Sequence, residues 1–199
     1  MTDMQDFEAY GWRDVVPADL LAIYAPYRRT RKVPGRAALV ILHPASEMPL
    51  SVQPGWAVAA GRILAQSRKM SLPIIHSAEP EGPFAPGVDR HGDDVVVRRP
   101  CDSAFMFSDL PAVLKRRGAS GLVLCGATTS GSVRATAVEA KSYGYKVAIA
   151  EEATADQASL LHKMALFDIA HKYADVMSVD EMLGLMDGAR WGSVESKSR

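Results

Sequence analysis

A turn between an apolar strand and a helix holds the residue best placed for nucleophilic chemistry. The segment VLCGATTSGSVRATAVEA, residues 123–140, predicts a strand, a tight turn of small residues and a helix. Ser132 therefore lies at or near the amino end of that helix, where free amide N–H groups and the helix dipole stabilise an anion or a developing oxyanion. A well-capped helix start with small, closely packed side chains would read the same way. Spacing alone leaves both interpretations open.

The same turn is close to a phosphate-binding loop but lacks one essential residue. Gly126 and Gly131 have the GxxxxG spacing, yet Ser132 and Val133 follow where that motif has Lys and then Ser or Thr. The lysine reaches the terminal phosphates in nucleotide-binding loops. Without it, the sequence does not favour nucleotide hydrolysis.

Alternating strands and helices must position these residues. Apolar runs predict strands at 37–42, 72–76, 95–97, 121–125, 146–150 and 174–177, and helical spacing predicts helices at 54–70, 109–117, 132–143, 156–172 and 178–186. Ser108 is a candidate N-cap, and Ser178 with Glu181 has the spacing of a capping box. This alternation predicts βαβ units with right-handed crossovers. We expect an α/β fold, a three-layer α/β/α sandwich around a six-stranded parallel sheet.

The predicted organisation has one domain and two flanking segments. Residues 1–36 carry many aromatic side chains without clean periodicity and predict an arm that wraps over its own domain or a neighbouring subunit. Residues 37–187 form the α/β domain, and 188–199 form a flexible tail.

The fold class indicates where a site should lie. In doubly wound sheets, ligands bind beyond the carboxyl ends of the strands, where the strand order reverses. That rule selects His43 after the first strand, residues 98–103 after the third, and residues 128–132 after the fourth.

Several blocks of the chain resemble one family. Residues from about 36 to 187 are similar to the isochorismatase-like cysteine hydrolases, which include N-carbamoylsarcosine amidase, nicotinamidase and maleamate amidohydrolase. The family pattern Gly-x-x-Thr-x-x-Cys-Val-x-x-Thr has its counterpart in GATTSGSVRAT at 126–136, preceded by Ser-Ala-Phe at 103–105 and the strand block RAALVIL at 36–42. The resemblance implies the isochorismatase-like form of the α/β/α sandwich. It also implies a homo-oligomer, a dimer or a tetramer.

The three catalytic positions that the resemblance implies hold other residues here. In the family they are a strand-one Asp, a Lys four residues before the Ser-Ala-Phe serine, and the Cys of the pattern. Those places hold His43, Arg99 and Ser132, with Leu42 as a second register at strand one. The thiolate mechanism of the family therefore does not carry over.

The substituted set is chemically coherent. An alcohol is a far weaker acid than a thiol, so Ser132 needs a general base, and the imidazole of His43 could serve at neutral pH. Arg99 would repel a second positive charge and keep His43 neutral, or it could bind a substrate carboxylate.

The resemblance also implies contacts around the reacting group. It implies a cis peptide at Ala127–Thr128, which would direct the amides of Thr128 and Ser132 at the oxyanion. We expect Phe105 and Thr129 to contact the substrate. The expected activity is hydrolysis of a small amide, carbamoyl or ester compound with no cofactor. The alternative is a catalytically inactive relative that binds a small molecule or acts as an oligomeric scaffold.

Other candidate residues favour structural roles. Cys125 ends an apolar strand and is expected in the core, whereas Cys101 could place a thiol near the pocket. His91 lies in an acidic loop that could hold a divalent ion, although a solvated loop is the favoured interpretation and we expect no metal. His162 and His171 are expected on a helix surface.

Composition limits the class of protein. The 199 residues are 48% apolar and 23% charged, typical of a globular domain, and 23 Lys and Arg balance 23 Asp and Glu. Two cysteines cannot build a disulfide framework or a four-cysteine zinc site. The N-terminus is acidic, and no apolar run approaches the roughly 18 residues of a spanning helix. We expect a cytoplasmic protein whose partner is a small-molecule substrate, with neither nucleic acid nor a membrane as a partner.

Overall fold

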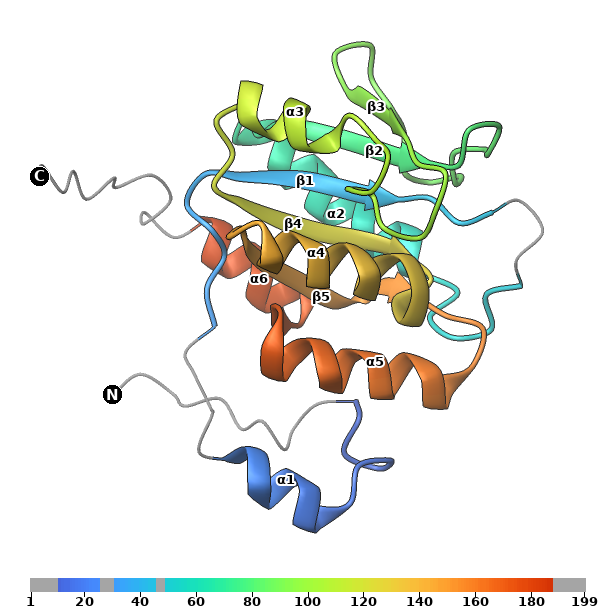
Figure 1. The fold of residues 1–199 in the computed structure, drawn as a ribbon, viewed down its shortest axis with the longest axis vertical. Coiled ribbons are helices and arrows are strands. Elements are labelled where there is room, and N and C mark those ends of the chain that lie inside the picture. The colour runs from blue at the N-terminus through green and yellow to red at the C-terminus, as the bar shows by residue number, and fades with distance from the viewer. Residues whose placement is uncertain (1–10, 26–30, 46–48, 188–199) are drawn as a thin grey trace, which may run out of the picture.

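The predicted alternation of strands and helices folds around one parallel sheet (Figure 1). The computed structural model describes residues 11–25, 31–45 and 49–187. All paired strands are parallel, in the order β3-β2-β1-β4-β5-β6, which confirms the predicted six-stranded parallel sheet. The strands are β1 (Ala37–Leu42), β2 (Ile74–Ala78), β3 (Val95–Arg98), β4 (Gly121–Ala127), β5 (Lys146–Ala155) and β6 (Asp175–Met177).

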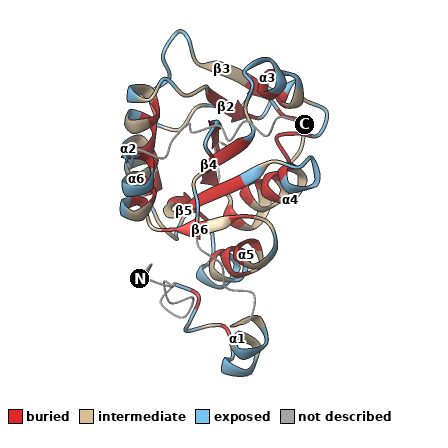
Figure 2. Cartoon of the chain, turned by 90° about the vertical axis from the view of Figure 1, so that its left-hand side faces the viewer, coloured by how far each residue is buried: buried red, intermediate tan, exposed pale blue. Residues whose placement is uncertain are grey.

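Helices cover both faces of this sheet, as Figure 2 shows. Helices α2 (Trp56–Lys69) and α6 (Val179–Asp187) pack against one face. Helices α3 (Leu110–Arg116), α4 (Arg134–Ser142) and α5 (Ser159–Lys172) pack against the other. Each face has its own apolar cluster, so the central strands β1 and β4 are buried along their whole length. The expected three-layer sandwich is confirmed.

The strand order reverses between β1 and β4. Leu42 at the end of β1 pairs with Gly126 in β4. The segments that leave β1 and β4 diverge at this point, and in such sheets the resulting crevice is where ligands bind. The site expected from the sequence lies at this edge.

Several boundaries differ from the predictions, for local reasons. Strand β2 begins at Ile74 because Pro73 has no N–H to donate to the ladder, although its carbonyl accepts from Leu39. The helix predicted from 132 begins instead as a π-helical turn, η3 (Thr129–Val133), which continues into α4. The hydroxyl of Ser178 accepts from the Glu181 amide, which is one half of the predicted capping box. The hydroxyl of Ser108 accepts from the Leu110 amide, but the N-cap position of α3 is Asp109 and not the predicted Ser108.

The N-terminal arm packs against its own domain. Trp12 is 1% exposed, and its ring meets the edge of Phe167 on α5 with 6.2 Å between ring centroids. Tyr24, from the short helix α1 (Ala18–Tyr24), contacts the same ring. In its described part the arm therefore contacts its own domain through these two rings, and the helix α1 was not predicted. The predicted tail, 188–199, lies outside the described residues. Across the described ranges, no helix combines the length and apolar character needed to cross a membrane.

Candidate active site

The turn after β4 has the backbone geometry that the resemblance implied. The peptide bond between Ala127 and Thr128 is cis. The chain then enters η3, in which the Val133 amide donates to the Thr128 carbonyl at 3.0 Å. Ser132 lies within this turn and is 5% exposed. The first turn of a helix leaves amide N–H groups without acceptors inside the helix, so this turn can offer donors to a developing oxyanion.

Gly126 lets β4 come close enough to β1 to place this turn. Its φ angle is +127°, a region that side chains rarely adopt, and a Cβ added there would lie 2.1 Å from the Leu42 carbonyl oxygen. Only glycine meets both conditions. The turn that carries Ser132 therefore depends on a glycine six residues upstream.

The side chain beside the Ser132 hydroxyl is a carboxylate. Ser132 Oγ lies 3.5 Å from Asp102 Oδ1, at the long limit of hydrogen bonding. Catalytic hydrogen bonds are often long without substrate and shorten when it binds. Asp102 was missed as an individual residue, although it falls inside the segment 98–103 that the fold class selected. The one feature of the sequence that pointed to Asp102 was its place in the loop that follows the third strand.

His43 has two partners, and neither is Ser132. The Ala85 amide donates to His43 Nδ1 at 2.8 Å, so the ring proton must sit on Nε2. That Nε2 lies 2.9 Å from His76 Nδ1 and donates to it. His76 in turn carries its proton on Nε2, which donates to Asp94 at 3.2 Å. One set of tautomers satisfies the whole chain, and both nitrogens of His43 are used.

Strand geometry explains why His43 does not meet Ser132. Side chains alternate along a strand, and Leu42 packs in the same apolar cluster as Val133 of the turn. Ile41 packs in the cluster on the opposite face, and His43 follows it to that side. The predicted hydrogen bond between Ser132 and His43 is therefore not formed among the described residues. The strand-one residue that packs with Val133 of the turn is Leu42, the second register.

The surroundings of His43 hold its ring neutral. Burial, followed by the charges of His76 and Arg99, lowers its pKa from 6.5 to about 3. The prediction that Arg99 opposes protonation of His43 agrees with this, although burial is the larger cause. Protonation would also place a hydrogen on Nδ1 against the Ala85 amide. In this geometry the ring cannot accept a proton from Ser132 without breaking an existing bond.

We expect the buried histidine to make the protein less stable in acid. The unfolded chain takes up a proton near pH 6.5, and the folded chain does so only near pH 3, so stability falls as the pH drops through that window. Each such group removes about 1.4 kcal/mol of unfolding free energy per pH unit. His76 and His162 also have lowered pKa values and add to the slope. Urea unfolding at several pH values between about 4 and 7, spaced by about one unit, measures how the free energy of unfolding depends on pH.

The matched variant for this pH dependence is His43→Asn, which keeps an acceptor for the Ala85 amide and removes the titrating ring. Its slope should be shallower than that of the wild type by about one proton. Equal slopes in the two proteins would contradict a neutral, buried His43.

Arg99 is held by main-chain carbonyls. It is buried, and its guanidinium donates to the His43 carbonyl at 2.8 Å and to the Cys101 carbonyl at 3.2 Å. Burial lowers its pKa, while Glu79 and Asp102 oppose that shift. The arginine therefore joins the ends of β1 and β3 and lies within the field of Asp102. Each terminal nitrogen carries two N–H groups and uses one of them in these bonds, so the alternative in which Arg99 binds a substrate carboxylate stays a prediction.

The two residues expected to contact substrate are both packed inside the protein. Phe105 is 3% exposed, and its ring stacks on Tyr143 with 5.3 Å between centroids. The Thr129 hydroxyl donates to the Ala155 carbonyl at 3.0 Å and lies 2.8 Å from His162 Nδ1. These contacts make Phe105 a core residue and make Thr129 an anchor of the turn. Contact of these two side chains with a substrate stays a prediction.

The remaining predicted candidates take structural places. Cys125 is fully buried, and burial raises the pKa of its thiol to about 12, as expected for a core residue. Cys101 is half-buried, with its sulfur 3.6 Å from the Met106 carbonyl. His162 was expected on the surface but is buried against Thr129. His91 belongs to no cluster of three or more metal-ligating side chains within the part of the chain that the structure describes.

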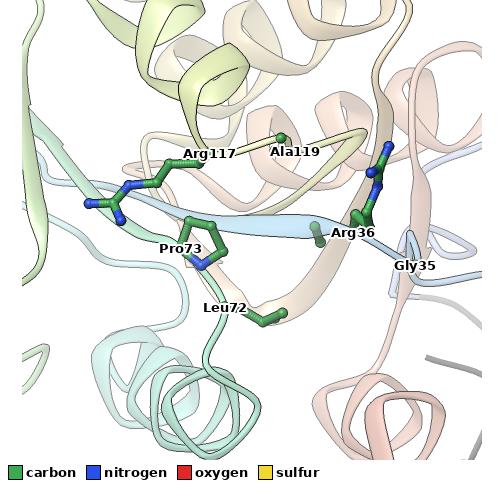
Figure 3. A pocket seen from close by; sticks show the side chains of 8 residues that line it. Gly35, Arg36, Leu72, Pro73, Arg117 and Ala119 are labelled. Carbon is green, nitrogen blue, oxygen red and sulfur yellow. The ribbon is translucent and has the colours of Figure 1, made fainter. Parts of the chain in front are cut away.

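A separate pocket lies at the other edge of the sheet. Its volume is about 210 Å³, and Arg36, Leu72, Pro73 and Arg117 are among the residues that line it (Figure 3). These residues precede or begin β1, β2 and β4, so the pocket is at the amino ends of the strands. Ser132, Asp102 and Arg99 follow carboxyl ends. The pocket is therefore not part of the candidate site.

Comparison with known proteins gives consistent matches. Residues 57–181, more than half of the chain, match the model of the isochorismatase domain. The maleamate amidohydrolase of Pseudomonas putida is 35% identical over 99 residues, which are 50% of this chain and 46% of that protein. The N-carbamoylsarcosine amidase of Arthrobacter sp. is 31% identical over 94 residues, 47% of this chain and 36% of that protein.

Solved structures extend the similarity beyond those segments. An isochorismatase family protein from Burkholderia thailandensis superposes with a TM-score of 0.71 at 26% identity. The match covers 79% of this chain and 99% of that protein. The matches to the two curated enzymes each span less than half of those enzymes. The activities named for those two enzymes are therefore theirs, and this chain is similar to part of their sequence.

Proposed function

Because this chain belongs to the isochorismatase family, we propose that it hydrolyses a small amide, carbamoyl or ester compound, with Ser132 as the nucleophile. One observation carries the proposal: the Ser132 hydroxyl lies at the amino end of the η3–α4 helix with a carboxylate beside it. That arrangement brings a nucleophile, a proton acceptor and amide donors together at one turn. The amidase activities of the two curated relatives support an amide or carbamoyl substrate.

The proposed reaction follows from the contacts of Ser132. Its Oγ attacks the substrate carbonyl carbon while its proton passes to Asp102. The amides of Thr128 and Ser132 stabilise the oxyanion that forms. Asp102 then gives the proton to the leaving nitrogen or oxygen as that bond breaks. A water molecule attacks the acyl-serine with Asp102 again as base, which releases the acid and restores the hydroxyl.

Asp102 takes the place that the sequence had assigned to His43. Both ring nitrogens of His43 are occupied, whereas the Asp102 carboxylate is exposed and within reach of the Ser132 hydroxyl. Arg99 supplies the positive charge near this carboxylate and binds the carbonyl of the preceding residue, Cys101. The proposed set therefore has Asp102 as the acid, Arg99 as the cation and Ser132 as the nucleophile, in place of the family's Asp, Lys and Cys respectively.

We expect Asp102→Asn to lower kcat by about 10²-fold, because the amide cannot accept the serine proton. The fold should be unaffected, since the Asp102 side chain is exposed. Steady-state kinetics with any substrate found for the wild type measure the effect. Asp109→Asn is the matched control, an exposed carboxylate near the end of the same loop. A loss of equal size in both variants would remove Asp102 from the reaction.

The proposal is tested by a panel of small amides, carbamoyl compounds and esters, together with labelling by a fluorophosphonate probe. The probe reacts with activated serine hydroxyls, so mass spectrometry should find it on Ser132 without any knowledge of the substrate. Turnover with labelling at Ser132 is the expected result. Turnover without labelling at that residue would place the chemistry elsewhere.

A second function is favoured by the way the fold uses two of the substituted residues. Both nitrogens of His43 and both terminal nitrogens of Arg99 bind the protein's own groups. This is the pattern expected for a non-catalytic relative that binds a small molecule or acts as a scaffold. Absence of turnover across the panel, together with absence of labelling at Ser132, would favour it.

Two further predictions concern the setting of the protein. We propose a homo-oligomer, a dimer or tetramer, which light scattering after size-exclusion chromatography would measure. We also propose a cytoplasmic location, with no nucleic acid, membrane or cofactor among its partners.

A further inference from the structure

We propose that Asp156 is a positioning residue that holds the π-helical turn in the geometry that Ser132 needs. This inference rests on the proposed function, because it concerns how the same turn is oriented. Asp156 directly follows β5. In the sheet, β5 is the neighbour of β4, the strand that leads into the turn with Ser132. Nothing in the sequence pattern had selected it.

The carboxylate of Asp156 is buried and binds the turn directly. Asp156 is 1% exposed, and its Oδ2 accepts from the Ser130 amide at 2.7 Å. Its other oxygen, Oδ1, accepts from the Gln157 amide at 2.8 Å. Ser130 is two residues before Ser132 in η3. One side chain thus connects the end of β5 to the start of the nucleophile turn.

The backbone of Asp156 is fixed as well. The Val52 amide donates to the Asp156 carbonyl at 3.0 Å, and the Asp156 amide donates to the Val52 carbonyl at 3.4 Å. The carboxylate is therefore attached to a residue that is held on both sides. A buried acceptor on a fixed backbone restricts where the Ser130 amide can lie.

Only a carboxylate satisfies both amides. Each oxygen of Asp156 accepts one N–H, so an asparagine would offer one acceptor and one NH₂ group to two donors. One backbone amide would then face a donor and lose its hydrogen bond to this side chain. The requirement is for two acceptor oxygens, which makes the isosteric variant informative.

The anchor also determines which amides remain for the reaction. Asp156 takes the Ser130 amide, while the proposed oxyanion donors are the amides of Thr128 and Ser132. A negative charge near the amino end of a helix is itself stabilised by the helix dipole. The structure thus separates a static acceptor for one amide of the turn from the site of the transient oxyanion.

A second contact holds the same turn from α5. The Thr129 hydroxyl can give its single proton to the Ala155 carbonyl, which leaves His162 Nδ1 to donate to Thr129 Oγ1. The residues that bind Thr129 and Ser130 therefore come from one stretch, Ala155 to His162. This stretch forms the wall against which the turn is set.

The test compares Asp156→Asn with Asp180→Asn, the same chemical change at an exposed side chain that pairs with Arg62. Hydrogen exchange by mass spectrometry should be faster in peptides covering 128–133 and 157 only in the first variant. With a substrate in hand, kcat should fall about 10²-fold, as expected for misplacement of a reacting group. KM should be unchanged, because Asp156 does not bind substrate. The acid limb of the pH profile of kcat should keep its midpoint, because Asp156 does not transfer a proton.

Each outcome decides between explanations. Unchanged exchange at 128–133 overturns the anchor, whatever the activity. Faster exchange throughout the chain shows a general loss of stability and also overturns it. A shifted acid limb would assign Asp156 to proton transfer instead of positioning. If the wild type hydrolyses nothing, the proposed function fails, yet the exchange comparison and the rate of fluorophosphonate labelling at Ser132 still test the anchor.

Discussion

Replacing Ser132 with alanine is expected to lower kcat/KM by about 10³-fold or more, because no other hydroxyl or thiol adjoins the Asp102 carboxylate among the described contacts. The serine is nearly buried, and loss of one oxygen leaves the helix start intact, so the melting temperature should change little. Kinetics on a substrate from the amide and ester panel, beside a thermal melt, separate the two effects. The fluorophosphonate label should disappear in the same variant.

The matched control for this substitution is Ser130→Ala. Ser130 lies in the same turn, and its contact with Asp156 uses the backbone amide and not the hydroxyl. Its removal should therefore leave kcat/KM within about two- to threefold of the wild type, the range of a small packing change. Equal activity in the wild type and in Ser132→Ala would remove Ser132 from the chemistry and place the reaction elsewhere in the protein.

Replacing Gly126 with alanine is expected to have the largest effect on stability. The new Cβ would lie 2.1 Å from the Leu42 carbonyl oxygen, and the φ angle of +127° disfavours any side chain. Backbone strain costs about 1–3 kcal/mol and overpacking a further 1–3 kcal/mol, so we expect a loss of about 2–6 kcal/mol in unfolding free energy. That is a large part of the roughly 5–15 kcal/mol that stabilises a typical domain.

Urea unfolding measures the loss, and Gly184→Ala is its control. Gly184 is an exposed residue of α6 with no atom within 4 Å of the position its Cβ would take. Alanine favours the helix there by about 0.5–1 kcal/mol, so the control should gain stability. A small loss in Gly126→Ala, comparable in size with that gain, would show that β1 and β4 need not approach so closely.

The elements were readable because their signals are local. The run AALVIL forms β1 over the same six residues, Ala37–Leu42, that the pattern predicted. Ser178 and Glu181 form the predicted cap because capping needs only residues a few positions apart. The edge of the sheet that holds the site also followed, since parallel strands bring their carboxyl ends to the same side.

The partners within the site were not readable in the same way. A shift of one residue along a strand moves a side chain to the opposite face, and the sequence left Leu42 and His43 both open. The fold packs Leu42 in the same apolar cluster as Val133 of the turn and directs His43 toward His76. Asp102, three residues after Arg99, reaches Ser132 through the path of a loop that no periodicity describes.

The amino-acid sequence by itself determined the layers of this protein, the edge of the sheet where chemistry would occur and the turn that carries the serine. These depend on apolar periodicity and on short-range hydrogen bonding, which act between neighbours along the chain. Only the tertiary structure decided that a carboxylate and not an imidazole stands beside that serine, and that Asp156 anchors the turn. Those contacts join residues about 26 to 30 positions apart, and their geometry exists only after strands from distant parts of the chain have paired.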